Sequence, residues 1–371
     1  MTRFQYAHAG GTSGGAAIEA CIEKLGSTVP QHGLGMLYVT DAIGDQLPAA
    51  LDRLKRVTGI DEWVGSVGIG ICATGREYFD EPAAAVMIAD LDQASYRVFE
   101  TIRDDLGEFS RDNGAWIARA PARFGIVHAD PRNQRTGDIV ADLADELDGF
   151  LVGGLSSSRA VPAQIAGKVT EGGVSGVLLS ETVTVATALS QSCMPIGPGH
   201  EITDCRGNIL IELDGRPALD VFKEEVGEEL ANDLRRVGGL IFASLPVPGS
   251  DTGDYLVRNI VGFDVDRGLI GIGELVERGA LLQFCRRDAD AAEQDLGRMV
   301  ESVKRRAGAE PRGGLYFSCL ARGPNMFGEA SEELRLIERA LGDVPLVGFF
   351  CNGEISHNRL YGYTGVLTLF P

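Results

Sequence analysis

Three stretches of the chain repeat the same order of apolar and polar positions. Each begins with an apolar strand, continues through a helix with one apolar stripe to a second strand that ends in Val-Gly, and closes with another apolar strand after a polar, glycine-rich loop. The stretches cover residues 35–91, 124–180 and 314–370. In the first stretch, Leu47, Leu51 and Leu54 follow the spacing of one helix face. We expect an α/β (mixed α+β) fold with two pseudo-repeated, layered domains, in which helices cover mixed sheets.

The rest of the chain adds further strands and contains no obvious linker. Four short apolar segments between residues 238 and 287 predict another mixed sheet. The strands that begin at residues 173 and 182 are separated by the short Ser180–Glu181 step, which predicts a hairpin. We place the domain boundary where the second repeat closes, which gives domains 1–180 and 181–371.

Two serines stand where helices are expected to begin. Ser331 precedes Glu332 and Glu333, and a serine followed by acidic residues is typical of a helix N-terminus. Ser13 lies in GTSGG, which has the GxSxG spacing of a nucleophile elbow. An α/β-hydrolase needs strands before its nucleophile, and only ten residues precede this motif. We therefore interpret GTSGG as the start of a helix or a turn.

Composition narrows the classes of partner. The chain has 371 residues and a formal net charge of −19, whereas binding to nucleic acid or to an anionic membrane needs clustered basic residues. No apolar stretch is long enough to span a membrane, and the N-terminus lacks the apolar core of a secretory signal. We expect a cytoplasmic protein that binds neither nucleic acid nor membrane.

Familiar catalytic and metal-binding motifs are missing or incomplete. GSVGIG at 65–70 does not have the GxGxxG spacing, and GxxxxGK[ST] and HExxH do not occur. The seven cysteines are scattered without a CxxC pair, which favours reduced thiols over a zinc site. We predict no catalytic residue and no metal site, and we do not expect an enzyme.

The loops after the Val-Gly pairs are the best candidates for a binding site, because open α/β sheets place ligands at the carboxyl ends of their strands. In these loops, Arg159 is suited to an acidic group, Glu354 and Asn352 to an amine or amide, and the glycines to close approach by the backbone. Arg322, which follows the opening strand of the third repeat together with Cys319, is also suited to an acidic group. The predicted ligand-binding residues are Gly65, Ser66, Cys72, Thr74, Gly153, Ser156, Arg159, Cys319, Arg322, Asn352, Gly353 and Glu354.

Several motifs in the second half resemble FIST domain proteins. The elements PIG at 195–197, GN-ELDG-PAL at 207–219, RRDA at 286–289, SC-ARG at 318–323 and GF-GEI at 348–355 occur in order. The first 180 residues are similar in layout to the FIST N-terminal domain, and the remainder resembles the FIST C-terminal domain. The resemblance implies a sensory, ligand-binding protein of prokaryotic signal transduction. Its ligand would be an amino acid or small carboxylate, and its signal would pass to a separate partner such as a histidine kinase.

Two alternatives remain open from the sequence. Some members of the family resemble haem proteins that sense nitric oxide, and a haem would need an axial histidine, for which His200 and His357 lie near family motifs. Many related sequences have His-Gly-Tyr-Thr just before the last strand, where this chain has Tyr-Gly-Tyr-Thr at residues 361–364. The missing histidine weakens a haem assignment at this loop. The other alternative is an enzyme that uses Cys319 or Cys351 as its nucleophile.

Overall fold

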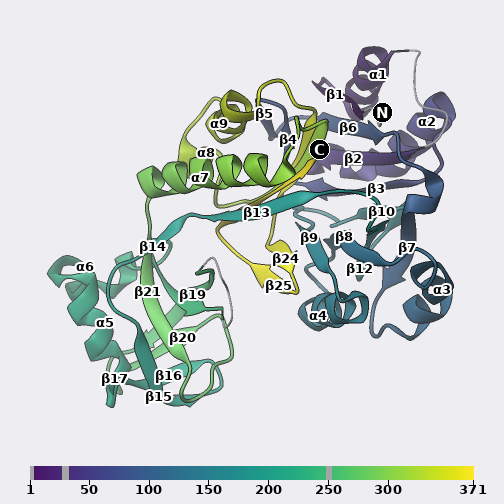
Figure 1. Cartoon of the computed structure of the whole chain (residues 1–371). Coiled ribbons are helices and arrows are strands. Elements are labelled where there is room, and N and C mark those ends of the chain that lie inside the picture. Colours follow the sequence, from purple (N-terminus) through teal and green to yellow (C-terminus); the bar gives the residue numbers. More distant parts are fainter. Residues whose placement is uncertain (1–3, 27–32, 248–252) are drawn as a thin grey trace. The chain divides into compact units, whose positions relative to one another are not determined.

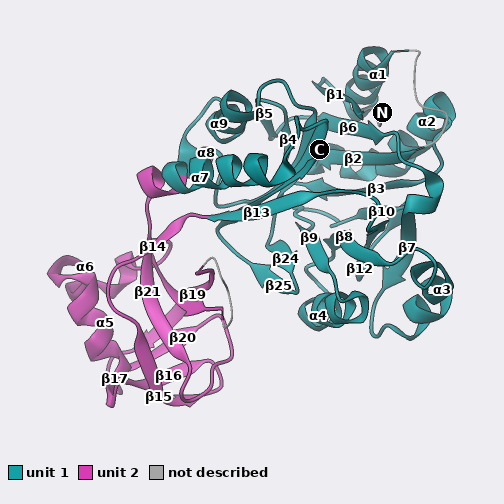
Figure 2. Ribbon diagram, viewed as in Figure 1, with its two compact units in different colours: residues 1–190, 293–371 teal, residues 191–292 magenta. Residues whose placement is uncertain are grey.

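The computed structural model describes residues 4–26, 33–247 and 253–371. Two compact units are present: unit 1 contains residues 1–190 and 293–371, and unit 2 contains residues 191–292 (Figure 2). Unit 2 therefore interrupts the chain of unit 1. The expected domains 1–180 and 181–371 describe halves of the sequence and stay a prediction, whereas the compact units divide at other positions.

Unit 1 contains three modules with one plan (Figure 1). In each module a leading strand and a helix precede two parallel strands joined by a second helix, and a hairpin and a closing strand follow. The first module contains β1 (Phe4–Gly10), α1 (Gly14–Leu25), β2 (Leu34–Thr40), η1 (Asp41–Gln46), α2 (Leu47–Thr58), β3 (Trp63–Gly68), β4 (Gly70–Ala73), β5 (Arg76–Phe79) and β6 (Ala83–Ala89). The second contains η2 (Gln93–Ser95), β7 (Tyr96–Ile102), α3 (Gly107–Ile117), β8 (Ala122–Ala129), α4 (Thr136–Leu147), β9 (Phe150–Leu155), β10 (Gln164–Ala166), β11 (Lys168–Thr170) and β12 (Val174–Ser180).

The third module is the one that unit 2 interrupts, after its leading strand. It contains β13 (Ala186–Gln191), α7 (Ala289–Ala307), β22 (Gly313–Cys319), α8 (Pro324–Phe327), α9 (Glu332–Leu341), β23 (Leu346–Cys351), β24 (Glu354–His357), β25 (Arg359–Tyr361) and β26 (Thr364–Phe370). Because each module forms the centre of a mixed parallel and antiparallel sheet covered by helices, the predicted α/β fold is confirmed.

The helices begin for different reasons at the two predicted serines. The Ser13 side chain accepts a hydrogen bond from the Ala16 backbone N–H at 3.2 Å, so GTSGG is the start of α1. Ser331 does not cap α9 with its side chain; its hydroxyl instead accepts a hydrogen bond from the Glu77 backbone N–H at 2.9 Å. Glu77 in turn accepts from the Leu334 N–H at 3.3 Å, so a residue of the first module caps a helix of the third.

The hairpins of the three modules are exchanged in a ring. The first module's hairpin, β4–β5, pairs with β23 of the third module. The third module's hairpin, β24–β25, pairs with β9 of the second, and the second module's hairpin, β10–β11, pairs with β3 of the first. Each sheet therefore needs a strand from another module, which makes unit 1 one folding unit and not a row of separate repeats.

The glycine of each Val-Gly pair is required by the parallel strand beside it. Gly65, Gly153 and Gly348 are in register with Leu37, Val127 and Tyr316. A Cβ at each glycine would overlap the carbonyl oxygen of its register partner. Gly65 and Gly153 also have φ values of 153° and 144°, which other residues rarely adopt. Close packing of the two parallel strands therefore explains why the Val-Gly pair recurs in each module.

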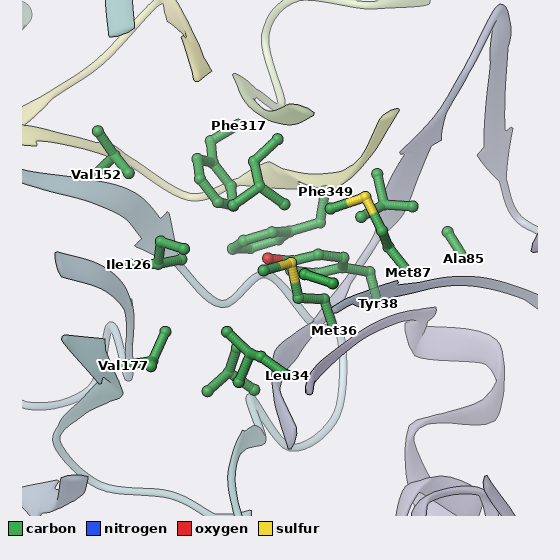
Figure 3. Packing of buried hydrophobic residues seen from close by; sticks show 14 of the residues in the cluster. Leu34, Met36, Tyr38, Ala85, Met87, Ile126, Val152, Val177, Phe317 and Phe349 are labelled. Atoms are coloured by element: carbon green, nitrogen blue, oxygen red, sulfur yellow. The ribbon is translucent and has the colours of Figure 1, made fainter. Parts of the chain in front are cut away.

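The three sheets share one apolar core on their inner faces. Side chains such as Leu34, Met36, Ile126, Val152 and Leu315 form this core, and Figure 3 shows several of them around Tyr38 and Phe349. The outer face of each sheet has its own core under helices: α1 and α2 on the first sheet, α3 and α4 on the second, and α7 and α9 on the third. Each sheet is thus apolar on both faces.

The predicted hairpin between the strands that begin at residues 173 and 182 is wrong. β12 pairs with β7 and β8, whereas β13 pairs with β26 of the third module. The short connection at Ser180–Glu181 carries the chain from one sheet to another. Sequence spacing could not separate these cases, because both need a short polar connection between apolar strands.

Unit 2 is an antiparallel barrel with a helix packed into its core. Its elements are β14 (Cys193–Pro195), β15 (His200–Arg206), β16 (Ile209–Leu213), β17 (Arg216–Pro217), α5 (Ala218–Val226), α6 (Glu228–Asn232), η3 (Leu234–Arg236), β18 (Ile241–Pro246), β19 (Tyr255–Asp264), β20 (Leu269–Ile272) and β21 (Leu281–Arg287). Pairing between β18 and β21 closes the ring of strands. Phe222 of α5 packs edge-on against Phe284 of β21, with ring centroids 4.9 Å apart.

Replacing Gly348 by alanine tests the close strand packing. We expect Gly348→Ala to lower the free energy of unfolding by at least about 3 kcal/mol, because the new methyl group overlaps the Tyr316 carbonyl. Gly114→Ala is the matched control, since Gly114 lies inside α3 with open space around its Cα. The control should be neutral or slightly stabilising. Equal stability of both variants in urea denaturation would show that the strands can separate at no cost.

Candidate functional site

The segments that follow β3, β9 and β23 meet at one place in unit 1, which we call the connector junction (residues 68–70, 155–158 and 351–354). Ser157 Oγ accepts a hydrogen bond from the Ile69 N–H at 2.9 Å and donates to the Phe350 carbonyl at 2.5 Å. The Asn352 N–H donates to the Leu155 carbonyl at 3.0 Å, and the Leu155 N–H donates to the Gly353 carbonyl at 2.8 Å. Residues of all three modules therefore contact one another here.

The shared inner core becomes polar toward the connector junction. Tyr38, His128 and Phe317 occupy the same register position in the three central strands, and their ring centroids lie 5.5 to 6.2 Å apart. The Tyr38 hydroxyl and His128 Nε2 are 3.1 Å apart. Ser66, the register partner of Tyr38, forms a hydrogen bond of 2.7 Å with Ser156 through their Oγ atoms. Polar groups thus lie beside the aromatic layer as well as beyond it.

Three buried polar atoms near this layer lack a hydrogen-bond partner in the described part of the chain: His128 Nδ1, Gln164 Nε2 and Glu354 Oε1. Gln164 and Glu354 hold the same position in exchanged hairpins, opposite Ser66 and Gly154 respectively. Burial alone lowers the pKa of His128 to about 3, so its ring is neutral at pH 7. Unpaired buried polar atoms are rare in folded proteins, and each costs about 1–3 kcal/mol.

Glu354 is the most unusual of these groups because it is an acid with no exposed surface. Glu354 Oε2 accepts hydrogen bonds from the Thr364 N–H at 3.1 Å and the Thr364 hydroxyl at 2.8 Å, while Oε1 has no such partner among the described residues. The neighbouring Cys319 thiol and the Arg322 charge act with Thr364 to lower the pKa of the carboxyl. Burial raises the pKa of Glu354 to about 8, against the opposing effect of the Thr364 hydrogen bonds. The group is therefore mostly protonated at pH 7 and is ready to ionise beside a cation.

The two cysteines considered as nucleophiles in the enzyme alternative lie beside Glu354. Cys319 and Cys351 are register partners on the parallel strands β22 and β23, and Glu354 acts on both electrostatically. Burial raises the pKa of each thiol, and the Glu354 carboxyl raises it further. Nucleophilic cysteines need the opposite shift, so the environment gives no support to a thiolate nucleophile.

The two predicted arginines are not free to bind an acidic ligand. The buried Arg322 guanidinium forms an ion pair with Glu333 at 2.7 Å and a hydrogen bond to the Tyr316 hydroxyl at 3.2 Å. Arg159 is exposed and pairs with Asp41 at 3.3 Å and with Asp80 at 2.7 Å. Both guanidinium groups already face carboxylates of this chain.

The other predicted residues divide between the junction and the surrounding core. Asn352 is exposed and Gly353 is partly exposed, so the connector just before Glu354 reaches solvent. Cys72 is buried on the outer face of its sheet, in the core under α7 and α9. Thr74 donates to the Val344 carbonyl at 2.7 Å and accepts from the Leu346 N–H at 3.0 Å. The structure therefore brings Ser66, Ser156, Asn352, Gly353, Glu354 and Cys319 together and gives Cys72, Thr74 and the arginines contacts elsewhere.

The histidines named for a haem do not fit that cofactor. His200 Nδ1 lies 2.6 Å from Asp214 and Nε2 lies 2.8 Å from Glu225, so both ring nitrogens of this buried histidine already face carboxylates. His357 is exposed at a turn and its ring stacks on Phe150, with centroids 5.2 Å apart. Neither histidine lines the larger cavity of unit 1, and we derive no step through a haem.

The larger cavity of unit 1 lies away from the connector junction. It has a volume of about 1210 Å³ and is lined by β7, by α3 and the segment before it, and by residues 62 and 166–168. A smaller cavity of about 220 Å³ is lined by residues such as Phe4, Asp92, Thr182 and Arg312. None of the predicted ligand-binding residues lines either cavity, and the junction itself is closed by direct hydrogen bonds.

Sequence reasoning missed His128, Gln164 and Glu77, although the repeats contain a signal for two of them. Superposing the three repeats places His128 with Tyr38 and Phe317, and Gln164 with Glu354. Glu77 had no such signal, because its role as a helix cap depends on the hairpin exchange.

Comparison with known proteins identifies the family of this chain. The FIST N domain matches residues 33–216 and the FIST C domain matches residues 218–357. Uncharacterized protein Rv0628c of Mycobacterium tuberculosis (strain ATCC 25618 / H37Rv) is 35% identical, over 96% of each chain. Uncharacterized protein Mb0898c of Mycobacterium bovis (strain ATCC BAA-935 / AF2122/97) is 33% identical, over 96% of this chain and 95% of that protein.

The chain belongs to the FIST family, and the predicted resemblance is confirmed. FIST domains are generally considered sensory, ligand-binding domains of signal transduction. The division between the two family domains falls at residues 216–218, inside compact unit 2. Among the described residues, no helix has the length and apolar character needed to cross a membrane.

The buried acids predict how stability depends on pH. Burial, with the charge of Glu333 next in size, raises the pKa of Glu77 to about 8, as burial does for Glu354. A raised folded-state pKa gives stability that is complete below the unfolded value of 4.5 and is lost as pH rises through about 8. The free energy of unfolding should therefore fall between about pH 5 and about pH 9, by about 1.4 kcal/mol per pKa unit for each group.

The double variant Glu77→Gln/Glu354→Gln should lose much less stability over that range, measured by urea denaturation. Glu329→Gln, at an exposed position, should follow the wild type. A double variant with the wild-type slope would exclude these acids as its cause.

The histidines predict a second titration. Burial lowers the pKa of His200, but the hydrogen bonds to Asp214 and Glu225 outweigh it and raise the pKa above 6.5. NMR titration of the ring protons should show a His200 midpoint above 6.5, which falls in Glu225→Gln, and no His128 transition until pH approaches about 3. A His128 midpoint near that of a free histidine would contradict its burial beside Tyr38.

Proposed function

We propose that this protein is a sensor whose connector junction binds a small ligand bearing an amine, of which a free amino acid is the simplest example. Membership of the FIST family supports a sensory, ligand-binding role. The observation that carries the proposal is the buried Glu354 carboxyl, which has an oxygen without a partner where all three modules meet.

An ammonium group is the chemistry that this carboxyl is best suited to bind. Placing a cation beside Glu354 favours its ionised form, so the buried acid exchanges its proton for an ion pair. The Asn352 side chain, two residues away, offers a carbonyl and an amide to the rest of the ligand. A ligand whose only charged group is a carboxylate has less support, because Arg159 and Arg322 already form ion pairs with carboxylates of this chain.

The connector before Glu354 is the proposed route for the ligand. Asn352 is exposed, and Gly353 has a φ of 141°, which few other residues adopt. Tyr363, next to the Thr364 that binds Glu354, also has a positive φ of 63°. A small change in these two segments uncovers the carboxyl and leaves the strands in place.

Ligand binding at the junction would alter contacts between modules, which supports a signalling role. Ser157 and Asn352 join strands that belong to different modules, so displacing either one changes how the modules pack. Such a shift between two arrangements is what a separate signalling protein, for example a histidine kinase, would recognise.

Calorimetry with the twenty amino acids and with simple amines tests the proposal. We expect an amine-bearing ligand whose affinity falls about tenfold for each pH unit below about 8, because Glu354 must lose its proton to bind. Glu354→Gln should abolish both the binding and its pH dependence, while Glu329→Gln leaves them unchanged.

A ligand that binds Glu354→Gln with wild-type affinity would exclude this site. An affinity independent of pH in the wild type would show that Glu354 does not exchange its proton on binding.

A further inference from the structure

The larger cavity of unit 1 runs along an unpaired sheet edge. β7 is the last strand of its sheet, and among the described strands it pairs with β12 alone. Residues 97–102 of β7 all line the cavity, together with α3 and the turn between β10 and β11. β7 and α3 lie next to each other in Figure 1. A free edge presents backbone donors and acceptors that can pair with another extended chain.

The equivalent strand of the first module shows how such an edge can be closed. β1 also ends its sheet, but His8 bonds to the Tyr78 hydroxyl of β5 at 2.6 Å and Tyr6 donates to Asp343 at 3.1 Å. Along β7 the contacts with the neighbouring hairpin are Thr101 with Thr170 at 2.6 Å and Glu100 with Lys168 at 3.0 Å. These contacts lie toward one end of β7, and the cavity opens along the strand beside them.

The cavity wall combines an apolar base with an acidic rim. Phe99 of β7 and Phe109 of α3 meet edge to face at 5.3 Å, and Arg97 joins the two elements through Asn113 at 3.2 Å. Six carboxylates and four basic side chains line the cavity, which leaves an excess of two negative charges. The carboxylates are Glu62, Glu100, Asp104, Asp105, Glu108 and Asp112, and the basic residues are Arg97, Arg103, Arg111 and Lys168.

We propose that this cavity is a docking site for an extended, basic peptide segment of a partner protein, which adds to the sheet as a strand beside β7. The backbone edge supplies hydrogen bonds to the peptide, and the acidic rim binds its basic side chains. The proposal goes beyond the ligand site, because it identifies a surface through which this protein contacts a partner protein. It depends on no property of Glu354.

Fluorescence anisotropy with designed peptides tests the docking site. The probe is a labelled eight-residue peptide of alternating lysine and valine, compared with its glutamate–valine counterpart and with a fully N-methylated lysine–valine peptide. We expect only the first to bind, because the second has the wrong charge and the third lacks backbone donors. Hydrogen exchange should also show slower exchange of β7 amides when the peptide is bound.

Charge reversal on α3 is the matching test on the protein. Glu108→Lys/Asp112→Lys should weaken binding at least about tenfold. The control Asp138→Lys/Asp142→Lys makes the same change, with the same spacing, on the exposed face of α4.

An equal loss of peptide affinity in both variants would show that binding reflects only general charge attraction, which would overturn the site. Binding of the N-methylated peptide, or unchanged β7 exchange, would overturn strand addition. Because none of these variants alters Glu354, failure here is distinguishable from failure of the amine site.

Discussion

The contact on which the rest of unit 1 depends is the close approach of two parallel strands in each module. Gly65, Gly153 and Gly348 lie against the carbonyl of a neighbouring strand, where a Cβ would overlap it. On the other side of each glycine runs a hairpin from a different module. The same glycines therefore hold the module's own strands together and set the place where the exchanged hairpin joins the sheet. The three-way exchange then brings the connectors to one junction, where they satisfy one another's hydrogen bonds.

Glu354 is the group whose hydrogen bonds the junction does not complete. The seryl and backbone groups around it pair across module boundaries, whereas its carboxyl keeps one free oxygen under full burial. A buried acid of this kind costs stability, and a binding role explains why that cost is tolerated. The edge of β7 is a different kind of unpaired group, because its backbone lies at the end of a sheet, beside a cavity that can take a protein chain. Ligand and partner would thus engage separate parts of unit 1.

The sequence predicted the fold class and directed attention to the loops after the Val-Gly pairs, but it did not show why these loops meet at one junction. The Val-Gly repeat is visible in the sequence, but the prediction that it ends each strand is wrong, because β3, β9 and β23 all continue beyond their glycine before the connector begins. The role assigned to the glycines in ligand contact remains a prediction, while their packing role required knowledge of the neighbouring strand. Arg322 illustrates the limit: its partner Glu333 lies eleven residues away on α9, and no spacing rule links them. The hairpin exchange was equally hidden, because strand pairing between modules leaves no local pattern.

Infrared difference spectroscopy of the Glu354 carboxyl tests the central claim most directly. Subtracting the spectrum of Glu354→Gln from that of the wild type isolates the C=O stretch of this one acid, free of the contribution from Glu77. The account predicts a band of a protonated, buried carboxyl at pH 7 that disappears when pH rises through about 8 and also when an amine ligand is added at constant pH. A band that is absent at pH 7, or that persists unchanged when the ligand binds, would contradict it.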